Sequence, residues 1–243
     1  ARHDGWADEI VSLADGWLQS KQLDTSQARS LTGAIVAFAD DPRIQQLVRD
    51  RLASAQTPEA SRLLLLRAMS RCRLSKFPPA WTELLKSQLT GTSASLRDEA
   101  VNVVHFRNMM QFDTELKALA LGNDISTDQR VTALGIVASR LRPLPDDMFV
   151  LLTSRFAGDV DPLGRLSAAS AISQARLTNK QFAAVTKIIE REGPLTVPLL
   201  ATAFHHCRDE DLGRSLMGAL DKSPGGTAVA ADDIEKLLHN FPP

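Results

Sequence analysis

The chain has 243 residues, of which 44% are apolar and 23% are charged, and its formal net charge is −1. This composition excludes a disordered chain, and it disfavours a general nucleic-acid binder, which needs a clear excess of Lys and Arg to displace phosphate counterions. Only 5% of the residues are aromatic and none is Tyr, while Ala and Leu abound, so the sequence predicts helices rather than strands. No apolar run reaches the roughly 20 residues that a membrane-spanning helix needs.

An arginine returns about every 34 residues, usually with a small or apolar residue three places later. A fixed step of this size is typical of stacked helical repeats, in which each repeat buries its apolar face against its neighbours. Pro198 takes the sixth position of the series. We expect the arginines to form a structural ladder that ties repeat to repeat near the turns: Arg29, Arg62, Arg97, Arg130 and Arg165.

The apolar pattern divides the chain into about seven helical hairpins, each pairing an arginine-bearing helix with a second amphipathic helix. The first hairpin begins around Trp6 and Ile10, and the last ends around Leu237. The loosest connection is Ser223–Ala228, so we predict one continuous domain with the fold of a right-handed α-solenoid. The predicted hairpins span approximately residues 5–40, 42–72, 78–108, 112–142, 145–176, 178–208 and 209–241.

Helix-capping signals mark several of the predicted helix starts. A Ser, Thr or Asp oxygen at such a position accepts a hydrogen bond from a backbone N–H in the first turn. A proline directly after the cap costs nothing, because the N–H that it lacks has no partner within the helix. The expected caps are Asp24 with Gln27, Thr57 before Pro58, Ser126 with Gln129, Asp161 before Pro162 and Thr178 with Gln181.

Two segments, Leu96–Ala100 and Gln129–Ala133, place an arginine three residues before an alanine. In this respect the chain resembles HEAT repeats, whose second helix carries that pattern, and the resemblance covers almost the whole chain. The family often places an acidic residue in the turn within a repeat, where it bonds the arginine of a neighbouring repeat. Asp24 matches that position, whereas Thr57 and Thr92 replace the acidic residue in later repeats.

A narrower resemblance is carried by the C-terminal segments Ala203–Phe204, Asp209–Gly213, Leu216–Leu220, Lys222–Gly225 and Leu237–Pro242. They are similar to the closing HEAT repeats of planctomycete-type (PVC) haem-binding CxxCH multidomain proteins. There a sugar-dehydrogenase-like propeller precedes the repeats and a c-type cytochrome domain follows them. The resemblance implies a segment that links domains of an exported, periplasmic redox protein. The chain starts with Ala and stops at Pro243 without a CxxCH motif, so we expect a piece of a longer polypeptide.

Residues with catalytic or metal-binding chemistry do not gather into one site. His205, His206 and Cys207 are consecutive, and because neighbouring helix positions point about 100° apart, the three cannot converge on one ion without further ligands. Cys72 and Cys207 lie four repeats apart, too far for a disulfide. The sequence also has no Gly-rich phosphate loop and no nucleophile elbow. We therefore predict no catalytic residue, no metal site and no cofactor, and we expect that the chain is not an enzyme.

A second arginine series stands at the C-terminal ends of the same helices. A cation there is favoured by about 0.3–1 kcal/mol through the exposed carbonyl groups, which gives a structural explanation. The functional alternative is a cationic stripe that binds a carboxylate-rich partner surface. The candidate partner-binding stripe is Arg73, Arg107, Arg140, Arg176 and Arg208, with Arg71 and Arg142 close by in the sequence.

The leading interpretation is a non-catalytic scaffold or protein-interaction module, whose partner is another protein or neighbouring domains of the same polypeptide. One alternative is a HEAT-like DNA-binding or DNA-glycosylase module, which needs a basic groove with Trp, Tyr and a carboxylate near the flipped base. The absence of Tyr and the near-neutral charge speak against it, and we expect no nucleic-acid partner. The other alternative, a phycobilin-lyase-like protein, needs a tetrapyrrole pocket that the sequence does not reveal.

Overall fold

The computed structural model describes residues 6–20, 22–158, 160–239 and 241. In this part of the chain there are fourteen α-helices, five short 3-10 helices and no strand, so the predicted all-α class is confirmed. No described helix is long and apolar enough to cross a membrane. Residue 5, at the start of the first predicted hairpin, and residues 240 and 242, used for the narrower resemblance, lie outside the described residues.

Two compact units make up the chain, one ending at Glu115 and the other beginning at Leu116. Each of the seven predicted hairpin ranges holds two of the α-helices. Helix α7 (Asp113–Leu121), which follows the 3-10 helix η1 (Met110–Phe112), contains the boundary between the units. The single continuous domain expected from the sequence stays a prediction.

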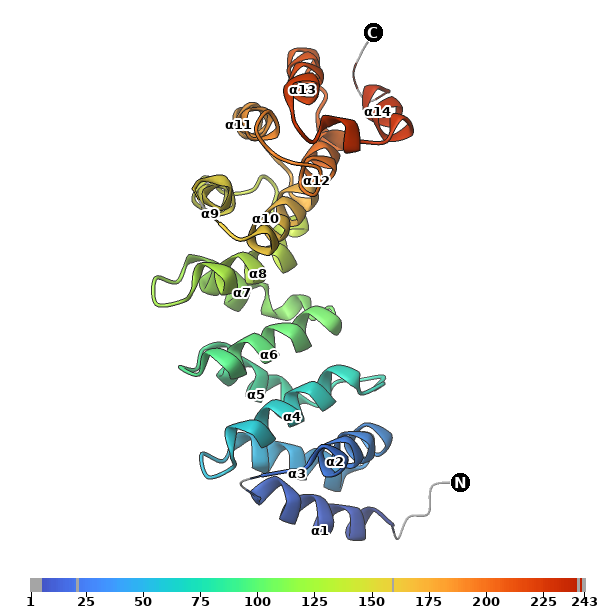
Figure 1. Ribbon diagram of the computed structural model, residues 1–243. Coiled ribbons are helices and arrows are strands. Elements are labelled where there is room, and N and C mark those ends of the chain that lie inside the picture. The colour runs from blue at the N-terminus through green and yellow to red at the C-terminus, as the bar shows by residue number, and fades with distance from the viewer. Residues whose placement is uncertain (1–5, 21, 159, 240, 242–243) are drawn as a thin grey trace. The chain divides into compact units, whose positions relative to one another are not determined.

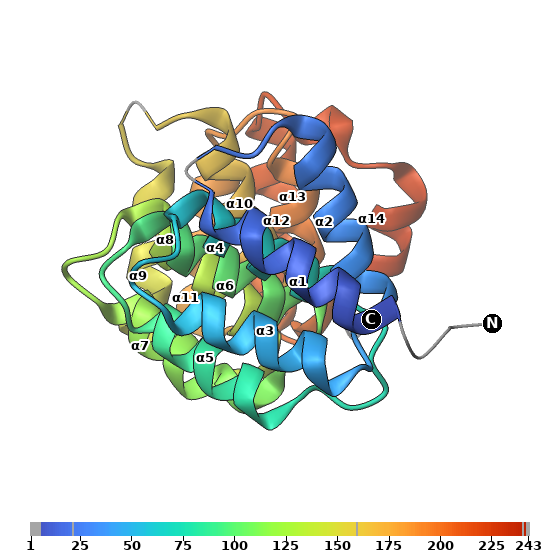
Figure 2. The same ribbon diagram turned by 90° about the horizontal axis from the view of Figure 1, so that it is seen from below.

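Unit 1 is built from two layers of helices (Figures 1 and 2). One layer contains α1 (Trp6–Gln19), α3 (Pro42–Ala53) and α5 (Pro79–Leu89), and the other contains α2 (Thr25–Ala37), α4 (Glu59–Arg71) and α6 (Ala94–Phe106). Apolar side chains spaced three and four residues apart fill the space between the layers. Trp81 of α5 is fully buried, and its indole N–H donates to the Gln45 carbonyl of α3 at 3.0 Å. This bond joins two neighbouring hairpins.

Unit 2 repeats the same plan. A row of packed helices is formed by α8 (Thr127–Val137), α10 (Pro162–Gln174) and α12 (Val197–Thr202), and α9 (Asp146–Thr153), α11 (Asn179–Ile189) and α13 (Glu210–Lys222) lie along one side of it (Figure 1). Helix α14 (Ala231–Leu238) contacts η4 (Ala203–His206). The remaining 3-10 helices are η2 (Ala138–Arg140), η3 (Ser154–Phe156) and η5 (Gly226–Ala228).

Four of the five predicted caps are confirmed, and one is wrong. The N-cap of α4 is Pro58, not Thr57, and it makes no side-chain hydrogen bond. Thr57 thus lies one residue too early to reach the first turn, and its Oγ1 is buried without a hydrogen-bond partner. The confirmed caps are Asp24 with Gln27, Ser126 with Gln129, Asp161 before Pro162 and Thr178 with Gln181.

The stretch that we expected to be the loosest, Ser223–Ala228, is held by specific contacts. Ser223 Oγ donates to the Glu192 carbonyl at 2.9 Å, and the Gly225 N–H donates to the same oxygen at 3.2 Å. A Cβ atom on Gly225 would stand 2.5 Å from the Gly193 oxygen, so only glycine permits this close approach. The segment after α13 is therefore pinned to the turn between α11 and α12.

Candidate partner-binding surfaces

Two arginines of the first series bind the turns of their own hairpins. Arg97 is nine-tenths buried, and its Nη2 donates to the Gly91 carbonyl at 2.7 Å. Arg130 Nε donates to the Ala120 carbonyl at 2.9 Å. Both acceptors lie at or near the end of the preceding helix, where carbonyl groups lack partners within the helix. The arginine thus ties the second helix of a hairpin to the turn that leads into it.

Arg165 makes the same kind of contact and also reaches the next hairpin. Its Nη2 donates to the carbonyl of Gly158, a glycine whose φ of 69° lies in the left-handed region that favours this residue. Its Nη1 pairs with Glu192 Oε1 at 3.0 Å, and Glu192 is only 5% exposed. Thr196 Oγ1 donates to the other carboxylate oxygen at 3.0 Å. The buried carboxylate of Glu192 therefore connects Arg165 of α10 with Thr196, the residue before α12.

The sequence patterns did not single out Glu192. It lies in the turn between α11 and α12, and it follows Arg165 by 27 residues. A search of every turn for Asp or Glu one hairpin after an arginine would have found it. Asp24, which occupies the corresponding turn of the first hairpin, accepts from the Gln27 N–H instead and caps its own helix.

The other two members of the first series are held differently. No polar contact to a described residue involves the side chain of Arg62, and its Nε is buried without a partner. Arg29 is exposed and lines a groove between α2 and α4. The regular spacing therefore does not give these five arginines one common role.

In the second series, Arg107 has a structural role. Its guanidinium group donates to the Cys72 carbonyl and, at 3.1 Å, to the Leu74 carbonyl. It also lies over the ring of Phe77, 5.4 Å from the centroid. Arg107 is the C-cap residue of α6, and the two carbonyl groups directly follow the end of α4. Arg107 therefore supplies hydrogen-bond donors at the C-terminal end of α4, the helix beside α6 in the same layer. Arg73 lies between the two acceptors in the sequence and is exposed.

In unit 2, cationic side chains gather around His206. Burial lowers the pKa of this imidazole from its ordinary value, and the charges of Arg176, His205, Arg208 and Arg142 lower it further. We call these five residues the basic cluster. They follow the ends of η2 and α10 or belong to η4 and the residues after it. Arg176 and Arg208 of the candidate stripe thus both lie close enough to His206 for their charges to act on it.

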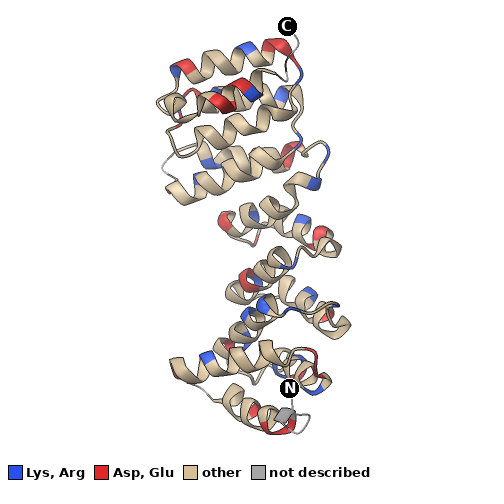
Figure 3. Cartoon of the chain, turned by 90° about the vertical axis from the view of Figure 1, so that its right-hand side faces the viewer, with Lys and Arg blue, Asp and Glu red and all other residues tan. Residues whose placement is uncertain are grey.

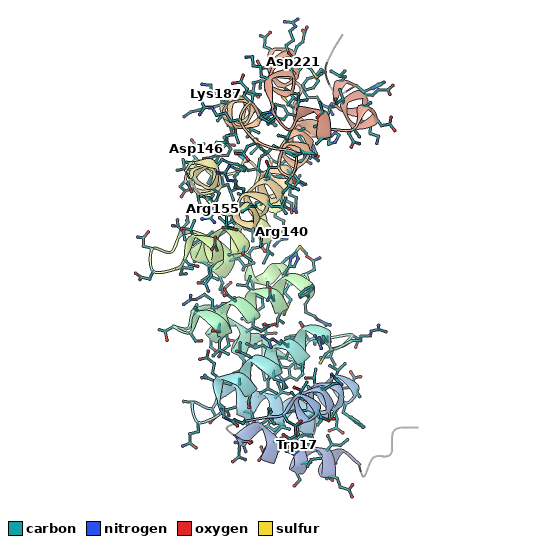
Figure 4. The ribbon with its side chains drawn as sticks, viewed as in Figure 1. Trp17, Arg140, Asp146, Arg155, Lys187 and Asp221 are labelled. Atoms are coloured by element: carbon teal, nitrogen blue, oxygen red, sulfur yellow. The ribbon has the colours of Figure 1, made fainter. Side chains whose placement is uncertain are left out.

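Arg140, the remaining stripe residue of unit 2, is the last residue of η2 (Figure 4) and is half-buried. It is not among the groups that shift the pKa of His206. It takes part in a polar or electrostatic interaction of its own. The basic cluster therefore overlaps the candidate stripe at Arg176 and Arg208 and adds Arg142 and the two histidines.

The cysteines and histidines show no arrangement suited to a metal ion in the described residues, where no group of three or more His, Cys, Asp or Glu side chains could hold one. Cys72 and Cys207 are buried free thiols. Burial raises the pKa of Cys72 to about 11 and also raises the pKa of Cys207. Both therefore stay protonated at neutral pH, and a protonated thiol is a poor nucleophile.

Figure 3 shows how charge is distributed on one side of the molecule. Segments coloured for Lys and Arg and segments coloured for Asp and Glu are scattered along the ribbon of both units in this view. This pattern agrees with the net charge of −1. Comparison with protein-family models and with curated protein sequences found no match for the chain.

Proposed function

We propose that this chain is a non-catalytic interaction module, built as a right-handed HEAT-like α-solenoid. Its basic cluster binds a carboxylate-rich surface of another protein or of neighbouring domains in the same polypeptide. Paired helical layers in each unit support the solenoid, because stacked helical repeats bury their core in this way. The observation that carries the binding role is the gathering of Arg142, Arg176 and Arg208 around two histidines.

The physical basis of binding is the close placement of like charges. The charged groups with the largest effect on the pKa of His206 are all cationic, and like charges held close together repel each other. A partner carboxylate placed among them relieves this repulsion. Guanidinium groups are suited to the task, because their planar donors match the two oxygens of a carboxylate. The cluster is local, so it fits a patch of Asp and Glu on a protein better than a long anionic polymer.

The finer part of the proposal concerns the larger protein. We propose that the module links domains of an exported redox protein of the planctomycete type, and the resemblance of segments between residues 203 and 242 supports this. The residues encoded after Pro243 test it. A downstream c-type haem motif would support the link, whereas a stop codon or an unrelated domain would overturn it and leave the binding role of the basic cluster untouched.

A direct test uses a fluorescein-labelled oligo-glutamate peptide of about ten residues and fluorescence anisotropy. The double variant Arg176→Glu/Arg208→Glu removes two cations from the cluster and is expected to weaken binding about tenfold or more. The matched control Lys187→Glu/Arg191→Glu makes the same change in net charge at exposed positions of unit 2, where neither side chain makes a described polar contact. Equal affinity of the two double variants would contradict the proposal.

A further inference from the structure

A groove of about 1030 Å³ lies between α2 and α4 of unit 1. Its lining is mostly small or apolar, with Ala28, Gly33 and Ala37 from α2 and Ala60 and Leu64 from α4. Small residues on neighbouring helices leave a shallow channel in which the side-chain ridge of a third helix can lie close to the backbone. The shape therefore suits a helical ligand.

The charged residues that line this groove are all cationic. Arg29 comes from α2, and Arg67 and Arg71 come from α4. Arg67 also pairs with Glu99 of α6 at 3.2 Å, but its side chain remains 58% exposed. The Arg29 side chain makes no hydrogen bond or ion pair within the described part of the chain. The groove therefore combines an apolar floor with a positive rim, which is complementary to an acidic amphipathic segment.

Two small residues belong to the lining of the groove. Ser61, from α4, is 1% exposed. Gly33 lies inside α2, where glycine costs roughly 1 kcal/mol relative to alanine, and a Cβ atom there would meet nothing within 4 Å. No neighbour within the chain therefore requires a glycine at this position.

We propose that the groove between α2 and α4 binds an acidic amphipathic helix of a partner protein. The apolar face of that helix packs on Gly33 and the surrounding small residues, and its carboxylates pair with Arg29, Arg67 and Arg71. The apolar floor favours a protein segment over a nucleic acid, because phosphate groups could pair with the arginines but would leave the apolar floor without a partner. This site lies in unit 1, is separate from the basic cluster and does not depend on it.

The test uses a fluorescein-labelled peptide of about 15 residues, a length at which an isolated helix becomes stable, with Glu on one face and Ala and Leu on the other. Gly33→Glu places bulk and negative charge in the groove and is expected to weaken binding about tenfold or more. Gly16→Glu is the matched control, because Gly16 lies inside α1, is exposed and also has nothing within 4 Å of a Cβ atom. The control is expected to bind within about twofold of the unchanged chain.

A second pair of variants keeps the test informative if Gly33→Glu disturbs folding, which circular dichroism would reveal. Arg29→Gln/Arg71→Gln is expected to weaken binding and to reduce its salt dependence, whereas Arg49→Gln/Lys76→Gln, at exposed positions outside the lining, is not. The proposal is overturned if Gly33→Glu and the double groove variant leave the affinity unchanged, or if a peptide with Lys in place of Glu binds equally well.

Sedimentation of the unliganded chain tests whether a second copy of this chain, rather than a partner helix, occupies the groove. If the chain forms a dimer that Gly33→Glu dissociates, a second copy fills the groove and the proposal of an acidic partner helix is overturned. Arg176→Glu/Arg208→Glu is expected to weaken binding of oligo-glutamate and to leave binding of the helical peptide unchanged. The two binding sites can therefore fail separately.

Discussion

Unit 1 and unit 2 carry the same repeated arginine, and in the described part of unit 1 only Arg97 bonds a turn carbonyl as the members in unit 2 do. In unit 2, Arg165 is bound by turn carbonyls and by the buried carboxylate of Glu192. In unit 1, Arg62 has a buried Nε without a partner, and Arg29 is exposed in a groove. The repeat period therefore determines the position of the arginine on its helix. The turn before that helix determines whether the arginine side chain has partners within the fold or stays available to a ligand.

The units also differ in how their hairpins are joined. In unit 1, the buried indole of Trp81 and the guanidinium of Arg107 donate to backbone carbonyls of the preceding hairpin. In unit 2, the joint at Glu192 depends on an ion pair, and Glu192 also offers its carbonyl to the segment after α13. We expect apolar burial to dominate the stability of unit 1 and a single carboxylate to matter more in unit 2.

The largest effect is expected for Trp81→Ala, which should lower the free energy of unfolding by about 3–5 kcal/mol because it opens a cavity and leaves a carbonyl unpaired. Trp17 also belongs to unit 1, so its fluorescence during urea unfolding reports on that unit. A loss below about 1 kcal/mol would contradict the importance of this joint.

Glu192→Ala should cost about 2–3 kcal/mol, since it removes the ion pair with Arg165 and the acceptor of Thr196. We expect this loss of stability in urea unfolding followed by circular dichroism, which reports on both units. The unfolding midpoint measured by tryptophan fluorescence should shift less. Glu190→Ala is the control, because Glu190 pairs with the exposed Lys222 and should contribute about 0–1 kcal/mol. Equal losses for the two variants would remove the distinction between the units.

Arg107→Gln should lower the stability of unit 1 by about 1–2 kcal/mol, because it removes two hydrogen bonds to the end of α4 and the contact with Phe77. Arg73→Gln, at an exposed position nearby, should change stability by less than about 0.5 kcal/mol. Urea unfolding followed by tryptophan fluorescence measures both. If Arg73→Gln proved the more destabilising, the structural role assigned to Arg107 would be wrong.

The basic cluster predicts a pH dependence. The pKa of His206 is lower in the folded chain than its ordinary value of 6.5, so its stabilising contribution is present above that pH and is lost as the pH falls toward the folded pKa. A bound acidic peptide favours the charged imidazole. Its affinity should therefore rise by roughly threefold between about pH 7.5 and pH 5.5, the effect of one added surface charge. His206→Ala should reduce this rise, and an unchanged pH profile would exclude His206 from the site.

The smallest effect is expected for Arg62→Met. Because the Arg62 Nε is buried without a partner, its replacement removes an unsatisfied donor while keeping much of the apolar stem. Stability should stay within about 0.5 kcal/mol of the unchanged chain. Arg97→Met should cost more, because Arg97 bonds the Gly91 carbonyl. Thermal unfolding compares the two, and a larger loss for Arg62→Met would mean that this arginine has a role in the ladder after all.

Local features of the fold could be predicted from the sequence. Helix pairs follow from apolar spacing, and the capping boxes at Asp24 and Thr178 involve residues only three positions apart. The error at Thr57 shows the limit of such signals, because a shift of one residue in the start of α4 removes the cap. A local motif thus predicts that a helix begins nearby more securely than it predicts which side chain caps that helix.

Most of the candidate surface could not be predicted. The pairing of Arg165 with Glu192 spans 27 residues and depends on the path of two turns. The groove between α2 and α4 depends on which small residues face each other across two helices, and the sequence period is the same whether or not a groove forms. Arg107 was named as a stripe residue, yet the structure places its donors on carbonyl groups of the neighbouring hairpin.

The most direct measurement titrates the labelled acidic helical peptide against Arg29→Gln and Arg165→Gln, at a temperature where both variants are folded. We predict that Arg29→Gln weakens binding by about threefold or more and leaves stability unchanged, because its side chain faces the groove. Arg165→Gln should bind as tightly as the unchanged chain and unfold more easily. Equal affinities for Arg29→Gln and the unchanged chain, or weaker binding by Arg165→Gln, would contradict a division of the arginine series into ligand-binding and structural members.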